Sequence, residues 1–130
     1  MQIPIVVFVV EDDALIHEML EDALTEGGFA VARAAGGAEA IQMLEVPTAG
    51  YRALVTDVNL LPGPVTGWDV ARRARELKPD MPVVYMTGAS APDWASKGVP
   101  NSVLVPKPFA PAQVVTAVSQ LINQGNMLGI

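Results

Sequence analysis

Apolar residues follow two different patterns along this chain, and the two patterns alternate. Ile5–Val10 is a continuous run rich in β-branched residues, which is typical of a strand that is buried on both faces. The next segment has apolar residues at helical spacing and stops at Gly27-Gly28, because glycine commonly ends a helix. Its two apolar stripes are Leu15, Met19 and Ala23, and beside them Ile16, Leu20 and Leu24. The pattern predicts one strand followed by one helix.

The same pair of patterns recurs along the rest of the chain. Further strands are predicted over residues 29–34, 53–56, 83–86 and 102–105, and further helices over residues 38–44, 68–77 and 111–124. Pro111 stands at the first position of the last helix, where proline is favoured. Residues 89–101 contain two prolines and a glycine, so we expect only one or two helical turns there. Strands that alternate with helices predict an α/β fold in which a parallel sheet carries helices on both faces.

Length and composition predict one domain and exclude several functions. The 130 residues contain no internal repeat or linker, so we expect one domain over residues 1–125 and a tail over residues 126–130. The absence of cysteine excludes disulfides, a thiolate nucleophile and a cysteine-based zinc site. A formal net charge of -6 argues against direct binding of nucleic acid. Ile3–Val10 is too short to span a bilayer and lacks the flanks of a signal peptide, so we expect a cytoplasmic protein without membrane contact.

Polar side chains follow the predicted strands at their carboxyl ends. Glu11 and Asp12 follow the first strand, Asp57 the third, Thr87 the fourth and Lys107 the fifth. Ligands of open parallel sheets bind beyond this edge, so we expect the five side chains to converge there. Three neighbouring carboxylates repel one another, and a hard divalent cation such as Mg²⁺ relieves that repulsion.

This set of groups predicts phosphoryl transfer to a carboxylate. Asp57 is the candidate nucleophile and would form an acyl phosphate. Lys107 and Mg²⁺ would offset charge on the phosphoryl oxygens, and the Thr87 hydroxyl would donate a hydrogen bond to one of them. Gly88 has no side chain and would leave the phosphoryl group access to this loop.

Four segments taken in order resemble the receiver domain of bacterial two-component response regulators. They are VVEDDALI, TD with Asn59 two residues further on and PG soon after, MTGAS, and PKPF. The resemblance covers essentially the whole chain and is closest in kind to single-domain receivers of the chemotaxis-regulator type. It implies a flavodoxin-like, doubly wound sheet of five strands in the order 2-1-3-4-5, with about five helices and a short fourth one.

The resemblance also implies a role for each candidate residue. Asp57 would receive the phosphoryl group from a histidine kinase or a histidine phosphotransfer protein. Thr87 and Lys107 would contact that group, and the Lys107-Pro108 peptide bond would be cis. The implied Mg²⁺ ligands are Asp12, Asp57, the backbone carbonyl of Asn59 and, through a bound water, Glu11.

Two features depart from the usual receiver pattern. The loop that follows Asp57 is two residues longer than in most receivers, and Leu104 stands where Tyr or Phe is usual. Both departures predict that the phosphorylated state is reported by an atypical route. Asn59 and Ala89 occupy two variable positions that would tune the attack of water on the phosphoryl group.

The leading hypothesis is a stand-alone receiver, because only residues 125–130 follow the last predicted helix. It would dock onto an unknown partner protein or drain phosphate from a relay, as a monomer or weak dimer, and would not be an enzyme beyond assisting its own phosphorylation. One alternative is the receiver of a hybrid histidine kinase. Another is a phosphorylation-independent interaction domain, although such domains usually lose part of the acidic pair, the aspartate or the lysine. An aspartyl-phosphate hydrolase would have a second acid at Asn59, and a flavin site would have a Ser/Thr/Gly-rich loop after the first strand.

Several other residues are predicted to have structural roles. Asp13 is expected to cap the first helix, since aspartate is favoured at that position. His17 lies one position beyond the apolar stripes and is expected on the solvated surface. Trp68 and Trp94 are expected to pack, and the arginines at positions 72, 73 and 75 are expected on a solvated helix face.

Overall fold

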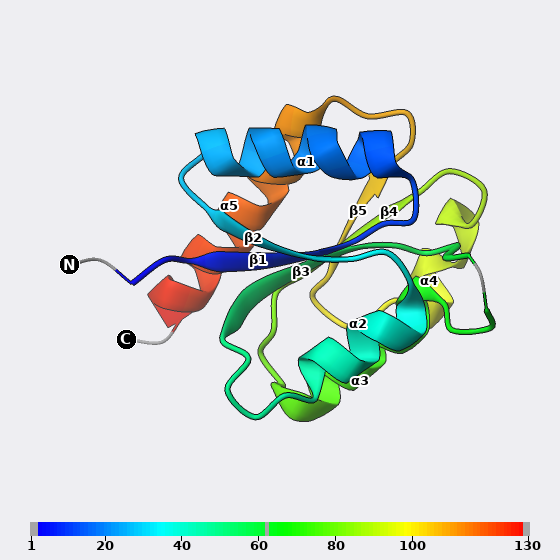
Figure 1. Cartoon of the computed structure of the whole chain (residues 1–130), viewed down its shortest axis with the longest axis horizontal. Helices are drawn as coiled ribbons and strands as arrows, with labels where there is room; N and C mark the ends of the chain where they lie inside the picture. The colour runs from blue at the N-terminus through cyan, green and yellow to red at the C-terminus, as the bar shows by residue number, and fades with distance from the viewer. Residues whose placement is uncertain (1–2, 62, 129–130) are drawn as a thin grey trace.

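A computed structural model describes residues 3–61 and 63–128, and five parallel strands form one sheet in the order β2-β1-β3-β4-β5 (Figure 1). The strands are β1 (Val6–Val10), β2 (Ala30–Ala34), β3 (Tyr51–Asp57), β4 (Val83–Thr87) and β5 (Val103–Pro106). The helices are α1 (Ala14–Glu26), α2 (Gly37–Leu44), α3 (Gly67–Leu77), α4 (Trp94–Lys97) and α5 (Pro111–Leu128), with a 3₁₀ turn η1 (Ala91–Asp93) before α4. The predicted α/β fold, strand order and short fourth helix are confirmed.

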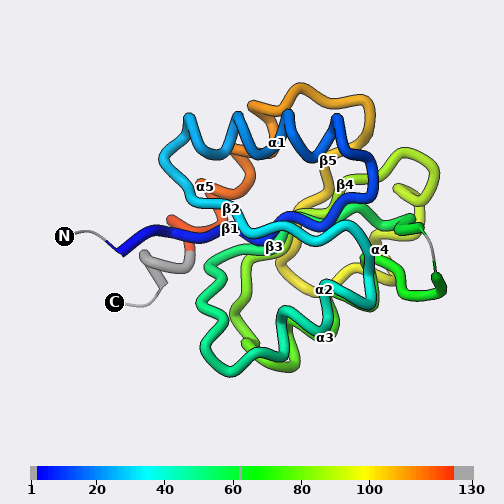
Figure 2. The backbone as a smooth tube through the Cα atoms, in the orientation of Figure 1, coloured from blue at the N-terminus to red at the C-terminus, as the bar shows by residue number. Residues whose placement is uncertain are grey.

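The helices lie in two layers, one on each face of the sheet. In Figure 1, α1 and α5 cover one face, and α2 and α3 cover the other; the backbone tube in Figure 2 traces the same two layers. Val7 and Val9 of β1 pack on the α1 and α5 side, whereas Phe8 and Val10 pack on the α2 and α3 side. All four side chains are fully buried, because each face of the strand has its own helical layer. This explains why the strand is a continuous apolar run rather than an alternating one.

The ends of the helices agree with the local signals in the sequence. The Asp13 carboxylate accepts hydrogen bonds from the backbone N–H groups of Leu15 (2.9 Å) and Ile16 (3.1 Å), so its predicted capping role is confirmed. The helix α1 ends at Gly27, and α5 begins at Pro111, as predicted. The helix α5 continues to residue 128, beyond the predicted end near residue 124. The predicted tail over residues 126–130 therefore starts as helix, and residues 129–130 lie outside the described residues.

The inward face of α1 differs from the predicted one. The prediction that His17 lies on the solvated surface is wrong, because His17 is only 3% exposed. Its Nε2 lies 3.2 Å from the backbone oxygen of Ala34. His17 shares its helix face with the buried Leu20 and Leu24, which stand three and seven positions further on. Leu15 is 72% exposed, so the first predicted stripe does not face the core at its start.

Arg75 differs from its two neighbouring arginines. Its Nε donates to the backbone oxygen of Met81 (2.6 Å) and its Nη1 to that of Pro100 (2.7 Å), so it joins α3 to the two loops that flank β4 and β5. The prediction of a solvated arginine face is therefore wrong for Arg75. Arg72 is exposed and pairs with Asp69 on its own helix.

None of the helices in the described part of the chain is long and apolar enough to cross a membrane.

Candidate functional site

Three carboxylates meet at the carboxyl edge of the sheet. Val10 of β1 lies opposite Thr56 of β3, so the residues that follow them along each strand stand side by side. One carboxylate oxygen from each of Glu11, Asp12 and Asp57 lies within 4.8 Å of the other two. Glu11 and Asp57 are buried, at 1% and 6% exposed, whereas Asp12 is exposed. The predicted convergence of the three acids is confirmed.

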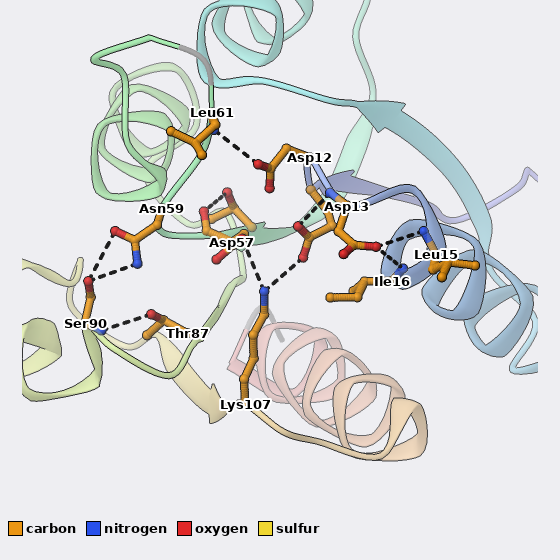
Figure 3. Close-up of polar contacts among 12 residues, drawn as sticks. Asp12, Asp13, Leu15, Ile16, Asp57, Asn59, Leu61, Thr87, Ser90 and Lys107 are labelled. Carbon is orange, nitrogen blue, oxygen red and sulfur yellow. Dashed lines mark hydrogen bonds and ion pairs between the residues drawn. The ribbon is translucent and has the colours of Figure 1, made fainter.

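Lys107 joins the two buried carboxylates. Its Nζ lies 3.2 Å from Glu11 Oε1 and 3.2 Å from Asp57 Oδ2 (Figure 3). The backbone N–H of Lys107 donates to the backbone oxygen of Thr87 (3.1 Å), which fixes the start of the side chain beside the end of β4. The Lys107-Pro108 peptide bond is cis, as the resemblance implied. Lys107 thus pairs one ammonium with both buried carboxylates.

Burial and mutual repulsion change the acid–base properties of this cluster. Burial, together with the negative charge of Asp57, raises the pKa of Glu11 from 4.5 to about 7. Burial alone would lower the pKa of Lys107, but the charges of Asp57 and Glu11 outweigh it and the pKa is raised. Lys107 therefore keeps its positive charge at neutral pH. The Lys107 ammonium lowers the pKa of Glu11, but burial and the charge of Asp57 outweigh it.

The backbone around Asp57 is tightly constrained. The Thr56 hydroxyl donates to the backbone oxygen of Asp57 (2.8 Å), and the N–H of Gly67 donates to the backbone oxygen of Val58 (2.8 Å). A Cβ at Gly67 would lie 2.0 Å from the backbone oxygen of Asp57, so any side chain there would push the strand end away. The start of α3 can approach Asp57 this closely only because residue 67 is glycine.

Thr87 lies at the end of β4 and is buried, at 1% exposed. Its hydroxyl oxygen accepts a hydrogen bond from the backbone N–H of Ser90 (3.2 Å). The Ser90 side chain in turn contacts the side-chain amide of Asn59 on the neighbouring loop. Ser90 was not among the predicted site residues. The available signal was a second hydroxyl residue three positions after Thr87 in the segment MTGAS.

The lengthened loop after β3 reaches the acidic cluster. The backbone N–H of Leu61 donates to Asp12 Oδ2 (3.4 Å), as Figure 3 shows. The Leu61 side chain is 68% exposed beside the cluster. Pro62, part of the predicted insertion, lies outside the described residues.

Leu104, which stands where receivers usually have Tyr or Phe, lies on β5. It lies opposite Tyr85 on the neighbouring strand β4, and it is partly buried. Tyr85 is fully buried, its hydroxyl accepts from the backbone N–H of Val99 (3.1 Å), and its ring lies 4.7 Å from that of Trp68. The Tyr85 side chain is therefore fixed in the core.

The acidic cluster has the chemistry of a site for a hard divalent cation. Carboxylate oxygens from three residues lie within reach of one another, and one of the three is open to solvent. Burial and, second to it, repulsion from Asp57 raise the pKa of Glu11, and a bound cation would offset both by favouring the charged carboxylate. These residues therefore fit a Mg²⁺ ion, and the contribution of the Asn59 carbonyl stays a prediction.

Comparison with known proteins identifies the family. The family model described as the response regulator receiver domain matches residues 7–119. The chain belongs to this family. A crystal structure of a response regulator receiver protein from Sinorhizobium medicae WSM419 is 44% identical, with a TM-score of 0.87 and coverage of 92% of this chain and 95% of that one. A receiver domain from Clostridium thermocellum, 21% identical with a TM-score of 0.83, shares the fold.

Curated relatives of this receiver domain are longer proteins. The probable transcriptional regulatory protein SilR of Salmonella typhimurium is 34% identical over 125 residues, which cover 94% of this chain and 53% of SilR. The transcriptional regulatory protein CusR of Escherichia coli K12 is 32% identical over 120 residues, which cover 90% of this chain and 51% of CusR. The chain thus spans about half the length of these relatives.

Proposed function

We propose that this receiver domain accepts a phosphoryl group on Asp57 from a phosphohistidine of a histidine kinase or a histidine phosphotransfer protein. The observation that carries the proposal is the position of Lys107 Nζ, 3.2 Å from Asp57 Oδ2 and 3.2 Å from Glu11 Oε1. It places one fixed positive charge beside a buried carboxylate nucleophile within a cluster of acids.

The chain's own residues account for most of the transfer step. A carboxylate oxygen of Asp57 attacks phosphorus, and the bond from phosphorus to the histidine nitrogen breaks with its electron pair going to that nitrogen. The Lys107 ammonium would contact an oxygen of the phosphoryl group on Asp57. Its raised pKa keeps it charged, so it would offset the negative charge of that oxygen. The Thr87 hydroxyl is free to donate a hydrogen bond, since its contact with Ser90 uses the oxygen as acceptor.

The acidic cluster would hold Mg²⁺ during this reaction. Asp12, Asp57 and the Asn59 carbonyl would bind it directly, and Glu11 would act through a bound water. When bound, Mg²⁺ supplies positive charge that stabilises the phosphoryl oxygens. Binding of the ion would also draw Glu11 into its ionised form, which its burial disfavours.

Exposed apolar side chains border the site and support a protein donor over a small-molecule one. Leu15 and Met19 on α1 are 72% and 48% exposed, and Leu61 on the other side of the cluster is 68% exposed. In Figure 3, Leu15 and Leu61 lie on opposite sides of Asp12. We infer that these three side chains contact the protein that carries the phosphohistidine, because apolar side chains exposed on α1 and on the loop after β3 suit a protein partner.

Output is proposed to occur by docking onto a partner protein. In most receivers an aromatic residue stands at position 104, whereas Leu104 is smaller and Tyr85 is held in the core by its hydroxyl contact with Val99. Movement of an aromatic side chain is therefore an unsuitable signal in this domain. The proposal concerns the receiver unit and is independent of what flanks it, so it applies equally to a stand-alone regulator and to the receiver of a hybrid kinase.

A phosphorylation assay tests the proposal. The protein is incubated with acetyl phosphate and Mg²⁺, and its intact mass is measured. We expect a mass increase of one phosphoryl group in the parent and in Asp22→Asn, which removes an exposed carboxylate on α1. The increase should be absent in Asp57→Asn and in EDTA. A parent that gains no phosphoryl group and does not respond to beryllofluoride would exclude the proposed function.

A further inference from the structure

The side chains of Asn59 and Ser90 join the loops that follow β3 and β4, beside Asp57 (Figure 3). Ser90 Oγ lies 3.2 Å from Asn59 Nδ2 and 3.3 Å from Asn59 Oδ1, although the two residues are separated by 31 positions in the chain. Asn59 belongs to the loop between β3 and α3, and Ser90 to the loop between β4 and η1. Figure 3 shows this contact beside Asp57, on the side away from Asp13. We call the Asn59–Ser90 contact the loop clasp.

The clasp is anchored to the groups that the proposed reaction uses. The Ser90 backbone N–H donates to the Thr87 hydroxyl oxygen (3.2 Å), so the backbone of Ser90 is tied to the end of β4. Asn59 follows Asp57 by two residues and is tied to the end of β3 by the chain itself. The clasp therefore links the loops that follow β3 and β4, at the carboxyl ends of these two strands.

We propose that Ser90 is a positioning residue that prolongs the life of the phosphoryl group on Asp57 by closing the clasp with Asn59. This inference rests on the proposed function. It assigns Ser90 a role that is separate from binding the phosphoryl group, the metal or the partner.

The role follows from the geometry of hydrolysis. The oxygen of a water molecule bonds to phosphorus while the bond from phosphorus to the Asp57 oxygen breaks, and that electron pair returns to the Asp57 carboxylate. The water gives up one proton to a phosphate oxygen, and inorganic phosphate leaves. The attacking and leaving oxygens must lie roughly in line, so water has to arrive from the solvent side of the site. Asp57 is 6% exposed, and Figure 3 shows the Asn59–Ser90 contact beside it. On this proposal, the clasp restricts the approach of water to the phosphoryl group.

The chemistry of the clasp calls for a hydroxyl group at position 90. An amide edge offers one acceptor and one donor at this spacing, and a hydroxyl can both donate and accept. Alanine can do neither, whereas threonine keeps the hydroxyl. The backbone at Ser90 has φ -98° and ψ 8°, which threonine can adopt. Ser90→Thr is therefore the conservative variant, and Ser90→Ala removes the clasp.

A double-mutant cycle tests this role. Protein phosphorylated with acetyl phosphate and Mg²⁺ is desalted, and the decay of the phosphorylated mass is followed for Ser90→Ala, Asn59→Ala and the double variant. We expect each single variant to shorten the half-life by roughly threefold to tenfold, the factor that one neutral hydrogen bond supplies. The double variant should decay no faster than either single variant, because both remove the same contact. Ser90→Thr should keep a half-life close to that of the parent.

The matched control and the opposing outcomes are equally specific. Ser96→Ala removes a hydroxyl that donates to the backbone oxygen of Asp93 (3.2 Å) within the same short helical segment, and its half-life should equal that of the parent. Asn59 is exposed, so Asn59→Ala tests the clasp even where Ser90→Ala folds poorly. An unchanged or longer half-life in either single variant would overturn the inference, as would a double variant whose factor is the product of the two. A parent that takes up no phosphoryl group at all would refute the proposed function instead.

Discussion

Glu11 makes the stability of the metal-free protein depend on pH, and Glu11→Gln should remove that dependence. Its carboxylate is buried at the end of β1, with Oε1 on Lys107 Nζ and Oε2 on the backbone N–H of Asp13 (3.1 Å). Burial and the nearby charge of Asp57 raise its pKa from 4.5 to about 7 in the folded state. Glutamine has nearly the same shape and does not titrate.

The sign of the effect follows from proton binding. Below the unfolded pKa of 4.5, Glu11 is protonated in both states and its contribution to stability is fully present. Between 4.5 and about 7 the unfolded chain has lost the proton that the folded protein still holds, so stability falls as pH rises. The full gap between the two pKa values corresponds to roughly 3 kcal/mol. The loss levels off above the folded pKa.

Urea unfolding in EDTA at a series of pH values measures this effect. The free energy of unfolding of the parent, minus that of Glu11→Gln, should fall by roughly 3 kcal/mol between about pH 4 and about pH 8. The subtraction removes contributions from groups that both proteins share. Excess Mg²⁺ should reduce the fall, because a bound cation favours the ionised carboxylate. A difference in the free energy of unfolding that stays constant across this range in EDTA would show that Glu11 does not have a raised pKa in the folded protein.

Two further variants test the contacts that hold the two ends of α3 in place. Gly67→Ala should lower the free energy of unfolding by at least about 2 kcal/mol and slow phosphorylation of Asp57, because the new Cβ would lie 2.0 Å from the Asp57 backbone oxygen. Gly50→Ala, where no atom lies within 4 Å of the added Cβ, is the control, and equal effects in urea unfolding would contradict the account. Arg75→Ala should lower the free energy of unfolding by about 1–3 kcal/mol, because the backbone oxygens of Met81 and Pro100 would each lose a hydrogen bond. Arg72→Ala should have a smaller effect, and the reverse order would count against a bracing role for Arg75.

The fold could be predicted because each strand has a clear local pattern. The apolar runs within β1, β3 and β4 are bounded by polar or turn residues, so their ends could be placed within a few positions. The polar residues that follow directly after these strands then had to share one edge of a parallel sheet. This is why the meeting of Glu11, Asp12 and Asp57 could be predicted without a structure.

The inward face of α1 could not be predicted for a physical reason. Leu15 and Met19 have the same helical spacing as core residues, and sequence alone does not distinguish an apolar residue that faces the core from one beside an exposed site. Counting them as core shifted the expected stripe and left His17 outside it. In the structure His17, Leu20 and Leu24 face the sheet, and the imidazole contacts the backbone oxygen of Ala34.

Contacts between loops that are distant in the sequence could not be predicted either. The Asn59–Ser90 clasp spans 31 positions, and the contact of Arg75 with Pro100 spans 25. Each depends on how two loops of irregular backbone lie side by side, and no periodic pattern specifies this. Such contacts are known only from the folded structure, whereas the ends of the strands could be predicted from local patterns.

The most direct test of the account is to locate the phosphoryl group. Borohydride reduces an aspartyl phosphate to homoserine, and peptide mass spectrometry then identifies the converted residue. After incubation with acetyl phosphate and Mg²⁺, we predict homoserine at position 57, with Asp12 unchanged. Conversion at Asp12 or another carboxylate, or a phosphorylated protein with no conversion at position 57, would contradict the assignment of Asp57 as the phosphoacceptor.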